Sequence, residues 1–401
     1  MKRRFSLLIC TFLCVAASAQ SPEVLRELRE RYDVVYPYAE DGIIQVIEGG
    51  RYNMPEGADN GKYGYVDTLG QIIVAPIFDY GRRFHNGFAG VERAGKWGAV
   101  DRRGREIVPT KWDCLENFEE GVAIGAIGRP YHWRYSLIDT AGRITPIKYD
   151  YCAKRFSCGL AVVGKGTYEA DLSQGIPKGL TAEDMLQEFK GKHGYIKPDG
   201  RLAIPLQYDA ADDFSENGLA PVGMQGKYYN KWGFIDTTGR MVIPCNYFYA
   251  GQFYRGRAVV GKVIPGGKLR YGYIDDSGRT VIPLQYDMAS NFDFANTWVG
   301  ADGGDGETRY WLIDRNGKQV LSFPVYRLQD GGKYGHAAAA VRDKTGALRY
   351  GIVANSGRIL VPFEYDSIDI FTDLDTQTLE ARETAVVTQD GRKFRLEIRL
   401  P

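Results

Sequence analysis

The side chains best suited to catalysis or metal binding are few and scattered in this sequence. Its four histidines are His85, His132, His193 and His336, and no two of them stand at the spacing of metal ligands. They also give no support for a catalytic triad. Residues 302–307, Asp-Gly-Gly-Asp-Gly-Glu, offer the oxygen ligands that calcium prefers, but they lack the full spacing of a calcium loop. The sequence therefore predicts no metal site, no cofactor and no catalytic residue.

Acidic residues are abundant enough to form the carboxylate pair of a glycoside hydrolase, but most recur at fixed positions. The recurring motif is Asp-x-x-Gly, as in Asp236 and Gly239. An Asp side chain there can bond the backbone amides of a type I turn, and Gly supplies the positive φ that follows. Because turns explain these acids, we expect a non-catalytic binding or scaffold protein. An exported hydrolase with its site in a groove of the fold is the alternative.

The turn belongs to a longer block, residues 231–244, which reads Lys-Trp-Gly-Phe-Ile-Asp-Thr-Thr-Gly-Arg-Met-Val-Ile-Pro. Residues 232–236 and 241–243 alternate as half-buried strands do, so the block predicts a hairpin. Pro244 cannot donate to a strand ladder and is expected to end the second strand.

Relatives of this block recur along the chain, with Gly194, Gly233 and Gly272 spaced 39 residues apart. Each turn is followed by a proline and, in six of the eight copies, by an aromatic-Asp pair such as Tyr208-Asp209. A Phe, a Gly and a short apolar run then predict a third strand. The eight turns lie at residues 67–70, 101–104, 139–142, 197–200, 236–239, 275–278, 314–317 and 354–357.

This pattern predicts an all-β fold with about eight three-stranded meander repeats. Each repeat is too small to bury its own apolar face, so neighbouring repeats must share one core. We expect an open, twisted, solenoid-like array. A closed β-propeller is the alternative, although its blades need four strands each.

The blocks at Lys96–Trp97–Gly98 and Lys231–Trp232–Gly233 resemble the WG-repeat (KWG-repeat) family of bacterial proteins. The resemblance covers roughly residues 32–371. It implies a repetitive β architecture with extracytoplasmic or interaction roles, and it provides no catalytic residues. Ser136 and Trp311 replace the repeat glycine, so we expect distorted hairpins at these two positions.

The ends of the chain differ from the repeats. Residues 1–19 combine Lys2, Arg3 and Arg4 with an apolar run and a small-residue cleavage pattern, which is typical of a secretory signal peptide. Residues 20–31 are predicted to form a capping helix, with Ser21 as N-cap. Residues 372–401 are predicted to form a capping hairpin. We expect an exported protein in the periplasm, at the cell surface or outside the cell, without a transmembrane segment.

Charge excludes one class of partner. The sequence has 51 basic and 50 acidic side chains, and removing the three in the signal leaves 48 against 50. Signs are interspersed, whereas nucleic-acid binding needs clustered positive charge. The expected partner is therefore an unidentified protein, peptide or glycan.

Recognition is expected in the loops that join each third strand to the next hairpin, because packing locks the strands. Candidate binding residues are aromatic side chains without a repeat role: Tyr131, Trp133, Tyr228 and Tyr229. The alternative is that they only cover a neighbouring repeat. An insertion at residues 164–191, predicted to contain a helix at 181–190, enlarges one such loop.

Four cysteines follow the signal: Cys114, Cys152, Cys158 and Cys245. A disulfide among the first three and four thiols are both compatible with the sequence, because cysteine positions alone do not fix connectivity.

Overall fold

The computed structural model describes residues 21–36, 41–53, 57–59, 61–170, 187–226, 230–292, 294–329, 335–374 and 381–398. The predicted signal peptide, most of the insertion, and Tyr228 and Tyr229 lie outside these residues. The chain divides into two compact units, Met1–Lys111 and Trp112–Pro401.

The first unit contains the helix and the first ten strands. They are α1 (Pro22–Arg31), β1 (Val34–Val35), β2 (Ile43–Glu48), β3 (Arg51–Asn53), β4 (Gly57–Asp59), β5 (Lys62–Asp67), β6 (Ile72–Phe78), β7 (Tyr80–Gly81), β8 (Phe88–Arg93), β9 (Lys96–Asp101) and β10 (Glu106–Trp112), whose last residue crosses the boundary. Two four-stranded sheets have the orders β1-β2-β5-β6 and β7-β8-β9-β10, and β3-β4 is a separate hairpin.

The second unit begins with four four-stranded sheets in chain order. Their strands are β11 (Cys114–Leu115), β12 (Val122–Arg129), β13 (His132–Asp139) and β14 (Ile144–Pro146); β15 (Tyr151–Cys152), β16 (Ala161–Ala170), β17 (Gln187–Ile196) and β18 (Leu202–Tyr208); β19 (Ala210–Ala211), β20 (Leu219–Gln225), β21 (Asn230–Asp236) and β22 (Met241–Tyr247); and β23 (Tyr249–Ala250), β24 (Ala258–Val263), β25 (Leu269–Ile274) and β26 (Thr280–Tyr286).

Three further sheets complete this unit. They are β27 (Met288–Ala289), β28 (Asn296–Asp302) and β29 (Thr308–Asp314); β30 (Arg327–Gln329), β31 (His336–Arg342), β32 (Leu348–Ala354) and β33 (Ile359–Tyr365); and β34 (Ser367–Leu374), β35 (Ala381–Gln389) and β36 (Arg392–Glu397).

The predicted all-β repeat array is confirmed, with one correction to the repeat unit. Most sheets are an open series of antiparallel strands that contains the predicted meander. A short extra strand such as β15 or β19 precedes the meander in most repeats, so these sheets have four strands. The extra strand begins at the residue directly after the aromatic-Asp pair, in a segment for which the sequence predicts no strand. Two residues are too few to show a periodic pattern.

The repeated turn has the predicted geometry. The Asp236 carboxylate accepts hydrogen bonds from the backbone N–H of Thr238 at 3.0 Å and of Arg240 at 3.1 Å. Gly239 has a φ of 84°, the left-handed conformation expected of a glycine at this position. A side-chain hydrogen bond from Thr238 is the main cause that lowers the pKa of Asp236 to about 2. The carboxylate therefore stays ionised and holds the turn.

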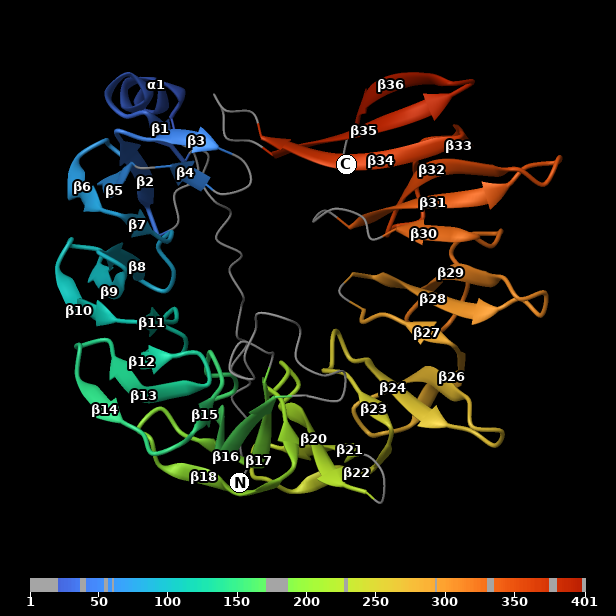
Figure 1. The fold of residues 1–401 in the computed structure, drawn as a ribbon, viewed down its shortest axis with the longest axis horizontal. Coiled ribbons are helices and arrows are strands. Elements are labelled where there is room, and N and C mark those ends of the chain that lie inside the picture. Colours follow the sequence, from blue (N-terminus) through green and yellow to red (C-terminus); the bar gives the residue numbers. More distant parts are fainter. Residues whose placement is uncertain are drawn as a thin grey trace, which may run out of the picture. The chain divides into compact units, whose positions relative to one another are not determined.

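Neighbouring repeats of the second unit share their core, as predicted. One cluster joins Tyr195 and Ile204 of the β15–β18 sheet to Val222 and Ile235 of the β19–β22 sheet. Figure 1 shows these two sheets side by side. A second cluster joins the β19–β22 sheet to the β23–β26 sheet in the same way. Each sheet therefore buries the apolar face of the one before it.

The first unit begins with the helix that the sequence predicts. α1 buries Leu28 against Val35, Ile44 and Val66, so it covers one face of the first sheet. Ser21 precedes α1, but its side chain makes no capping hydrogen bond; its carbonyl instead accepts from the N–H of Leu25 at 3.1 Å.

The C-terminal hairpin is part of a larger sheet. β35 and β36 form the predicted hairpin around Asp390 and Gly391, and β34 adds a third strand that starts before the predicted boundary.

The predicted helix at residues 181–190 is wrong for its last four residues. Residues 187–190 belong to β17, where Lys190 pairs with Thr167 and Phe189 with Tyr168. Pairing with β16 satisfies their backbone groups, and this non-local interaction overrides the local helical pattern. Residues 181–186 lie outside the described residues. The described part of the insertion therefore extends a hairpin.

No disulfide forms among the four cysteines, so the bridge among Cys114, Cys152 and Cys158 is not present. The Cys114 thiol lies 3.7 Å from Glu116 Oε1. Burial, followed by the nearby Asp213 carboxylate, raises the pKa of the Cys152 thiol to about 12. Cys152 is therefore a protonated core side chain at neutral pH.

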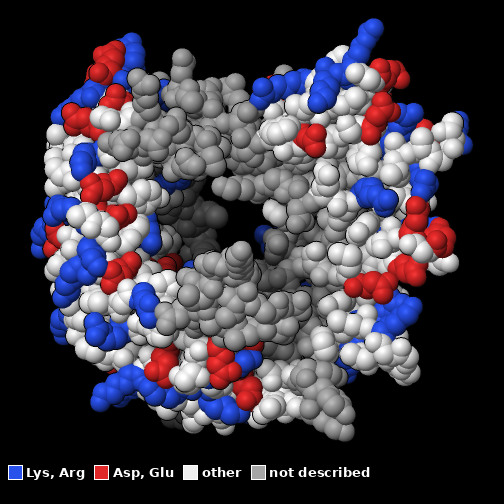
Figure 2. Space-filling view, viewed as in Figure 1, with Lys and Arg blue, Asp and Glu red and all other residues white. Residues whose placement is uncertain are grey.

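The surface charge agrees with the composition. Figure 2 shows basic and acidic side chains interspersed over the described surface of the face in view. In the described part of the chain, no helix has the length and hydropathy that a bilayer crossing needs.

Candidate ligand-binding groove

One repeat of the second unit is irregular and lies beside a cleft. In regular repeats the glycine after Trp, Tyr or His is required, because a Cβ on Gly194 or Gly233 would lie 2.4 Å from a carbonyl oxygen of the next strand. That strand approaches closely where a bulge shifts the register. Only Gly has room at this position.

The repeat around β13 has no such bulge. Gly142 and Pro146 are four positions apart, against five between Gly200 and Pro205 in the next repeat. β14 is accordingly three residues long instead of seven, and its pairing with β13 is regular. Ser136 can therefore replace the glycine. In place of the distortion expected at Ser136, β14 is shorter and pairs in regular register. Near Trp311 the sheet has three strands, β27-β28-β29.

The outer edge of β13 is open beyond Tyr135, as in the regular repeats, where the outer strand last pairs at His193 or at Trp232. The last backbone contact is a hydrogen bond from Ile147 N–H to Tyr135 O at 3.1 Å. Alternate residues of an antiparallel strand point their backbone groups to the same side, so Trp133 also directs its N–H and C=O outward. Gly128, opposite Trp133, donates instead to Asp113 at 2.9 Å, which agrees with this assignment. Among the described strands, none pairs with this edge of Trp133.

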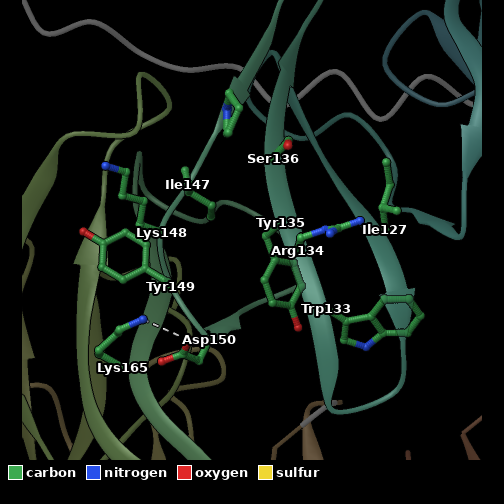
Figure 3. A pocket seen from close by; sticks show the side chains of 11 residues that line it. Ile127, Trp133, Arg134, Tyr135, Ser136, Ile147, Lys148, Tyr149, Asp150 and Lys165 are labelled. Carbon is green, nitrogen blue, oxygen red and sulfur yellow. Dashed lines mark hydrogen bonds and ion pairs between the residues drawn. The ribbon is translucent and has the colours of Figure 1, made fainter.

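Two adjoining cavities occupy the space beside this edge, with volumes of about 450 and 470 Å³. Both include Trp133 and Asp150, so they form one groove, which we name the Trp133 groove. Figure 3 shows the first cavity, with β13 on one side and residues 147–150 on the other. The groove is lined by Ile127, Tyr131, His132, Trp133, Arg134, Tyr135, Ser136, Pro146, Ile147, Lys148, Tyr149, Asp150, Lys165, Gly166, Thr167 and Tyr168.

Aromatic rings line the second cavity and continue beneath it. Tyr131, at the tip of the β12–β13 hairpin, lies 5.3 Å between ring centroids from Tyr168 of β16. Tyr168 lies 5.2 Å from Phe189, and Phe189 lies 5.0 Å from His193. The row ties two neighbouring hairpins together through side chains.

Two of the four predicted binding residues, Tyr131 and Trp133, therefore lie in one groove, and both are half-buried. Tyr131 also covers part of the neighbouring repeat through Tyr168, as the alternative expected. The binding role of Tyr131, Trp133, Tyr228 and Tyr229 stays a prediction.

Burial is the largest cause of the raised pKa of two groove tyrosines, Tyr135 and Tyr168. Beneath them, burial lowers the pKa of His193, and its Nδ1 has no hydrogen-bond partner among the described residues. The phenols and this imidazole are uncharged at neutral pH. The phenols of the wall can donate or accept hydrogen bonds from a ligand.

Asp150 is the one carboxylate that lines the groove in the described structure, and it is already engaged. Its Oδ1 accepts from Lys165 Nζ at 3.0 Å and its Oδ2 from Gly166 N–H at 3.0 Å. Asp209 accepts the equivalent backbone hydrogen bond from Gln225 N–H at 2.8 Å, whereas its lysine partner, Lys192, comes from the preceding strand β17. The Asp of the aromatic-Asp pair therefore ties down the following hairpin, which explains why it recurs.

The sequence did not identify Tyr135, Tyr149, Asp150 or Tyr168 as groove residues, because each matches the repeat pattern or lies in the insertion. The missing residue between Gly142 and Pro146 is the signal that could have located the site. It marks the repeat whose last strand cannot pair in full.

The acidic side chains of residues 302–307 bond to neighbouring groups of the chain. The Asp305 carboxylate accepts from Glu307 N–H and from Arg309, and Arg342 donates to the Glu307 carboxylate. Among the described residues, no group of three or more His, Cys, Asp or Glu side chains could hold a metal ion.

Comparison with known proteins decides the family. The model of the WG containing repeat matches residues 63–97, 97–124, 135–166, 194–228, 232–262, 271–294 and 350–373, which together are just over half of the sequence. The chain belongs to the WG-repeat family. The segment around Trp311 is unmatched, whereas the match at 135–166 includes most of the groove of this WG-repeat protein.

Several solved structures share part of the arrangement of the WG-repeat protein at low identity. One is dipeptidyl peptidase 4 from Porphyromonas gingivalis, with 7% identity over 88% of this chain and 64% of that one and a TM-score of 0.40. Another is prolyl oligopeptidase B from Galerina marginata, with 10% identity over 90% of this chain and 56% of that one and a TM-score of 0.34. A third is the WD40 domain of Toxoplasma gondii coronin, with 9% identity over 69% of this chain and 77% of that one and a TM-score of 0.27. The chain thus spans less than two thirds of the two enzymes. No curated protein matches the sequence.

Proposed function

We propose that this WG-repeat protein is a non-catalytic binding protein that holds a glycan in the Trp133 groove. The observation that carries the proposal is the combination of aromatic walls with an open backbone edge. The C–H face of a sugar ring packs well on an aromatic face, and its hydroxyl groups need donors and acceptors at the rim. Tyr131, Trp133 and Tyr168 supply the rings, and the Trp133 backbone supplies a donor and an acceptor.

The size of the groove supports a ligand of more than one unit. Small-molecule sites usually enclose roughly 300 to 1,000 Å³, and each of the two cavities is within that range. The cavities adjoin at Trp133, so an oligosaccharide can place one unit on each side of this ring.

Asp150 is the reason to favour binding over hydrolysis. Retaining and inverting glycosidases both use a pair of carboxyl groups. Asp150 is the one acidic side chain among the described lining residues, and its two carboxylate oxygens accept hydrogen bonds from Lys165 and Gly166. It lacks the partner that acid catalysis of glycoside cleavage requires.

An extended peptide is the second candidate ligand, because the open edge of Trp133 could accept a short strand. The edge offers the paired backbone groups of a single residue, which is little for strand addition. A glycan uses the rings as well, so we favour it.

Replacing Trp133 by Ala tests the proposal. We expect oligosaccharide binding, measured by isothermal titration calorimetry after a glycan-array screen, to weaken by about 30-fold, as for a central aromatic contact. Tyr254→Ala is the matched control, because Tyr254 is a 38% exposed ring outside the groove. Unchanged affinity in a folded Trp133→Ala variant, or a native chain that binds no oligosaccharide, would contradict the proposal.

We also propose that the protein is exported, on the basis of the basic residues, apolar run and Ala-Ser-Ala pattern of residues 1–19. Mass spectrometry of the native protein is expected to show a mature chain that begins at Gln20. Replacing Ala17 and Ala19 by Arg should block cleavage. Recovery of an uncleaved native chain from the cytoplasm would exclude export by this route.

A further inference from the structure

We infer that the ligand of the Trp133 groove is an acidic glycan, and that Arg134 and Lys148 bind its acid groups. The inference rests on the proposed glycan-binding function and adds the charge of the ligand to it. Both side chains line the first cavity. Figure 3 shows them on opposite sides of it, Arg134 extending from β13 and Lys148 from the segment that follows β14.

The charges of the groove do not balance. Lys165 is neutralised by Asp150, which is the one acidic side chain in the described lining. Arg134 and Lys148 are exposed, and neither has a hydrogen bond or an ion pair with any residue that the structure describes. Two positive charges therefore remain among the side chains that line the first cavity.

An anionic ligand would supply the missing partners. Arg presents a planar fork of donors that matches a carboxylate or sulfate, and Lys presents a compact charge on a flexible stem. Asp150 does not repel an acid strongly, because its charge is already shared with Lys165 and with the Gly166 amide.

The rings favour a glycan over an acidic peptide. Trp133 belongs to both cavities, and Tyr131 and Tyr168 wall the second one. A hexuronate chain presents a flat C–H face for a ring and a carboxylate at the edge of each unit. An acidic peptide presents its carboxylates on flexible stems and gains less from these rings.

A galacturonate trisaccharide and its methyl ester provide a direct test, because esterification removes the charge and keeps the sugar. We expect the native chain to bind the acid at least about tenfold more tightly than the ester, since one charged contact is worth about that factor. Rising salt concentration should lower the affinity for the acid and leave the affinity for the ester unchanged.

Charge-removing variants locate the effect. Arg134→Gln and Lys148→Gln should each lower the affinity for the trisaccharide acid by about tenfold, without changing the affinity for the ester. Lys231→Gln is the control, since Lys231 is an exposed lysine of β21 outside the groove. Thermal unfolding monitored by circular dichroism checks that each variant is folded.

Each outcome has one meaning. Equal binding of acid and ester, or no effect of either groove variant, overturns the acidic ligand while the glycan-binding function stands. If neither the acid nor the ester binds, and no member of a neutral glycan panel binds either, the proposed glycan-binding function is overturned. Binding of polyglutamate in place of the sugars, with the same dependence on Arg134 and Lys148, replaces the acidic glycan by an acidic peptide.

Discussion

Gly233→Ala is expected to lower the free energy of unfolding by about 3 kcal/mol, the upper range for overpacking a well-packed interior. The new Cβ would lie 2.4 Å from Ile243 O and 2.6 Å from Cys245 N. All the nearest atoms are backbone, and the bulged pairing of β21 with β22 holds them in place. No side-chain rotation can relieve this contact, so a strand must move. Urea denaturation followed by circular dichroism measures the loss.

Ser136→Ala is the matched control for Gly233→Ala. It occupies the same position in a repeat without the bulge, where a Cβ is already accommodated. We expect a change below about 1 kcal/mol. Equal losses for both substitutions, or a Gly233→Ala variant as stable as the native chain, would show that the close strand approach is not what selects the glycine.

Tyr195→Ala is expected to lower the free energy of unfolding by about 4 kcal/mol, as for removal of a large aromatic side chain from a core. Tyr195 is fully buried, and its ring lies 4.9 Å from that of Phe214. Its hydroxyl donates to Asp212 O at 2.9 Å, which ties β17 to the start of the next sheet. Burial is the largest cause of its raised pKa, so the hydroxyl remains protonated as a donor.

Tyr195→Phe separates the hydroxyl from the ring. We expect it to cost about 1 kcal/mol, the usual contribution of one hydrogen bond, with the rest due to packing. Phe234 occupies the equivalent position of the next repeat, packed 4.9 Å from Phe253, so the position tolerates a ring without a hydroxyl. Tyr254→Ala, at an exposed site, controls for loss of a surface ring. A loss in Tyr195→Phe as large as in Tyr195→Ala would mean that the hydrogen bond, and not the packing, joins the two sheets.

Local chemistry allowed the sequence alone to determine the repeats. The Asp236 turn, the left-handed Gly239 and the helix at Pro22–Arg31 follow from backbone preferences of neighbouring residues, and all three are present. Strand alternation and the recurrence of the block determined an all-β array with a core shared between neighbours. These features depend on residues close together in the chain or on their repetition.

Tertiary structure decided the features that need a partner strand. The short strands such as β19 form only because β20 offers an edge, and residues 187–190 are extended because β16 pairs with them. The groove follows the same rule. Pairing with β12 places Trp133 opposite Gly128, and the packing of two neighbouring hairpins brings Tyr131 beside Tyr168, 37 positions away in the sequence. The sequence determined which residues had no role in the repeat, whereas non-local strand pairing decided which of them line one groove.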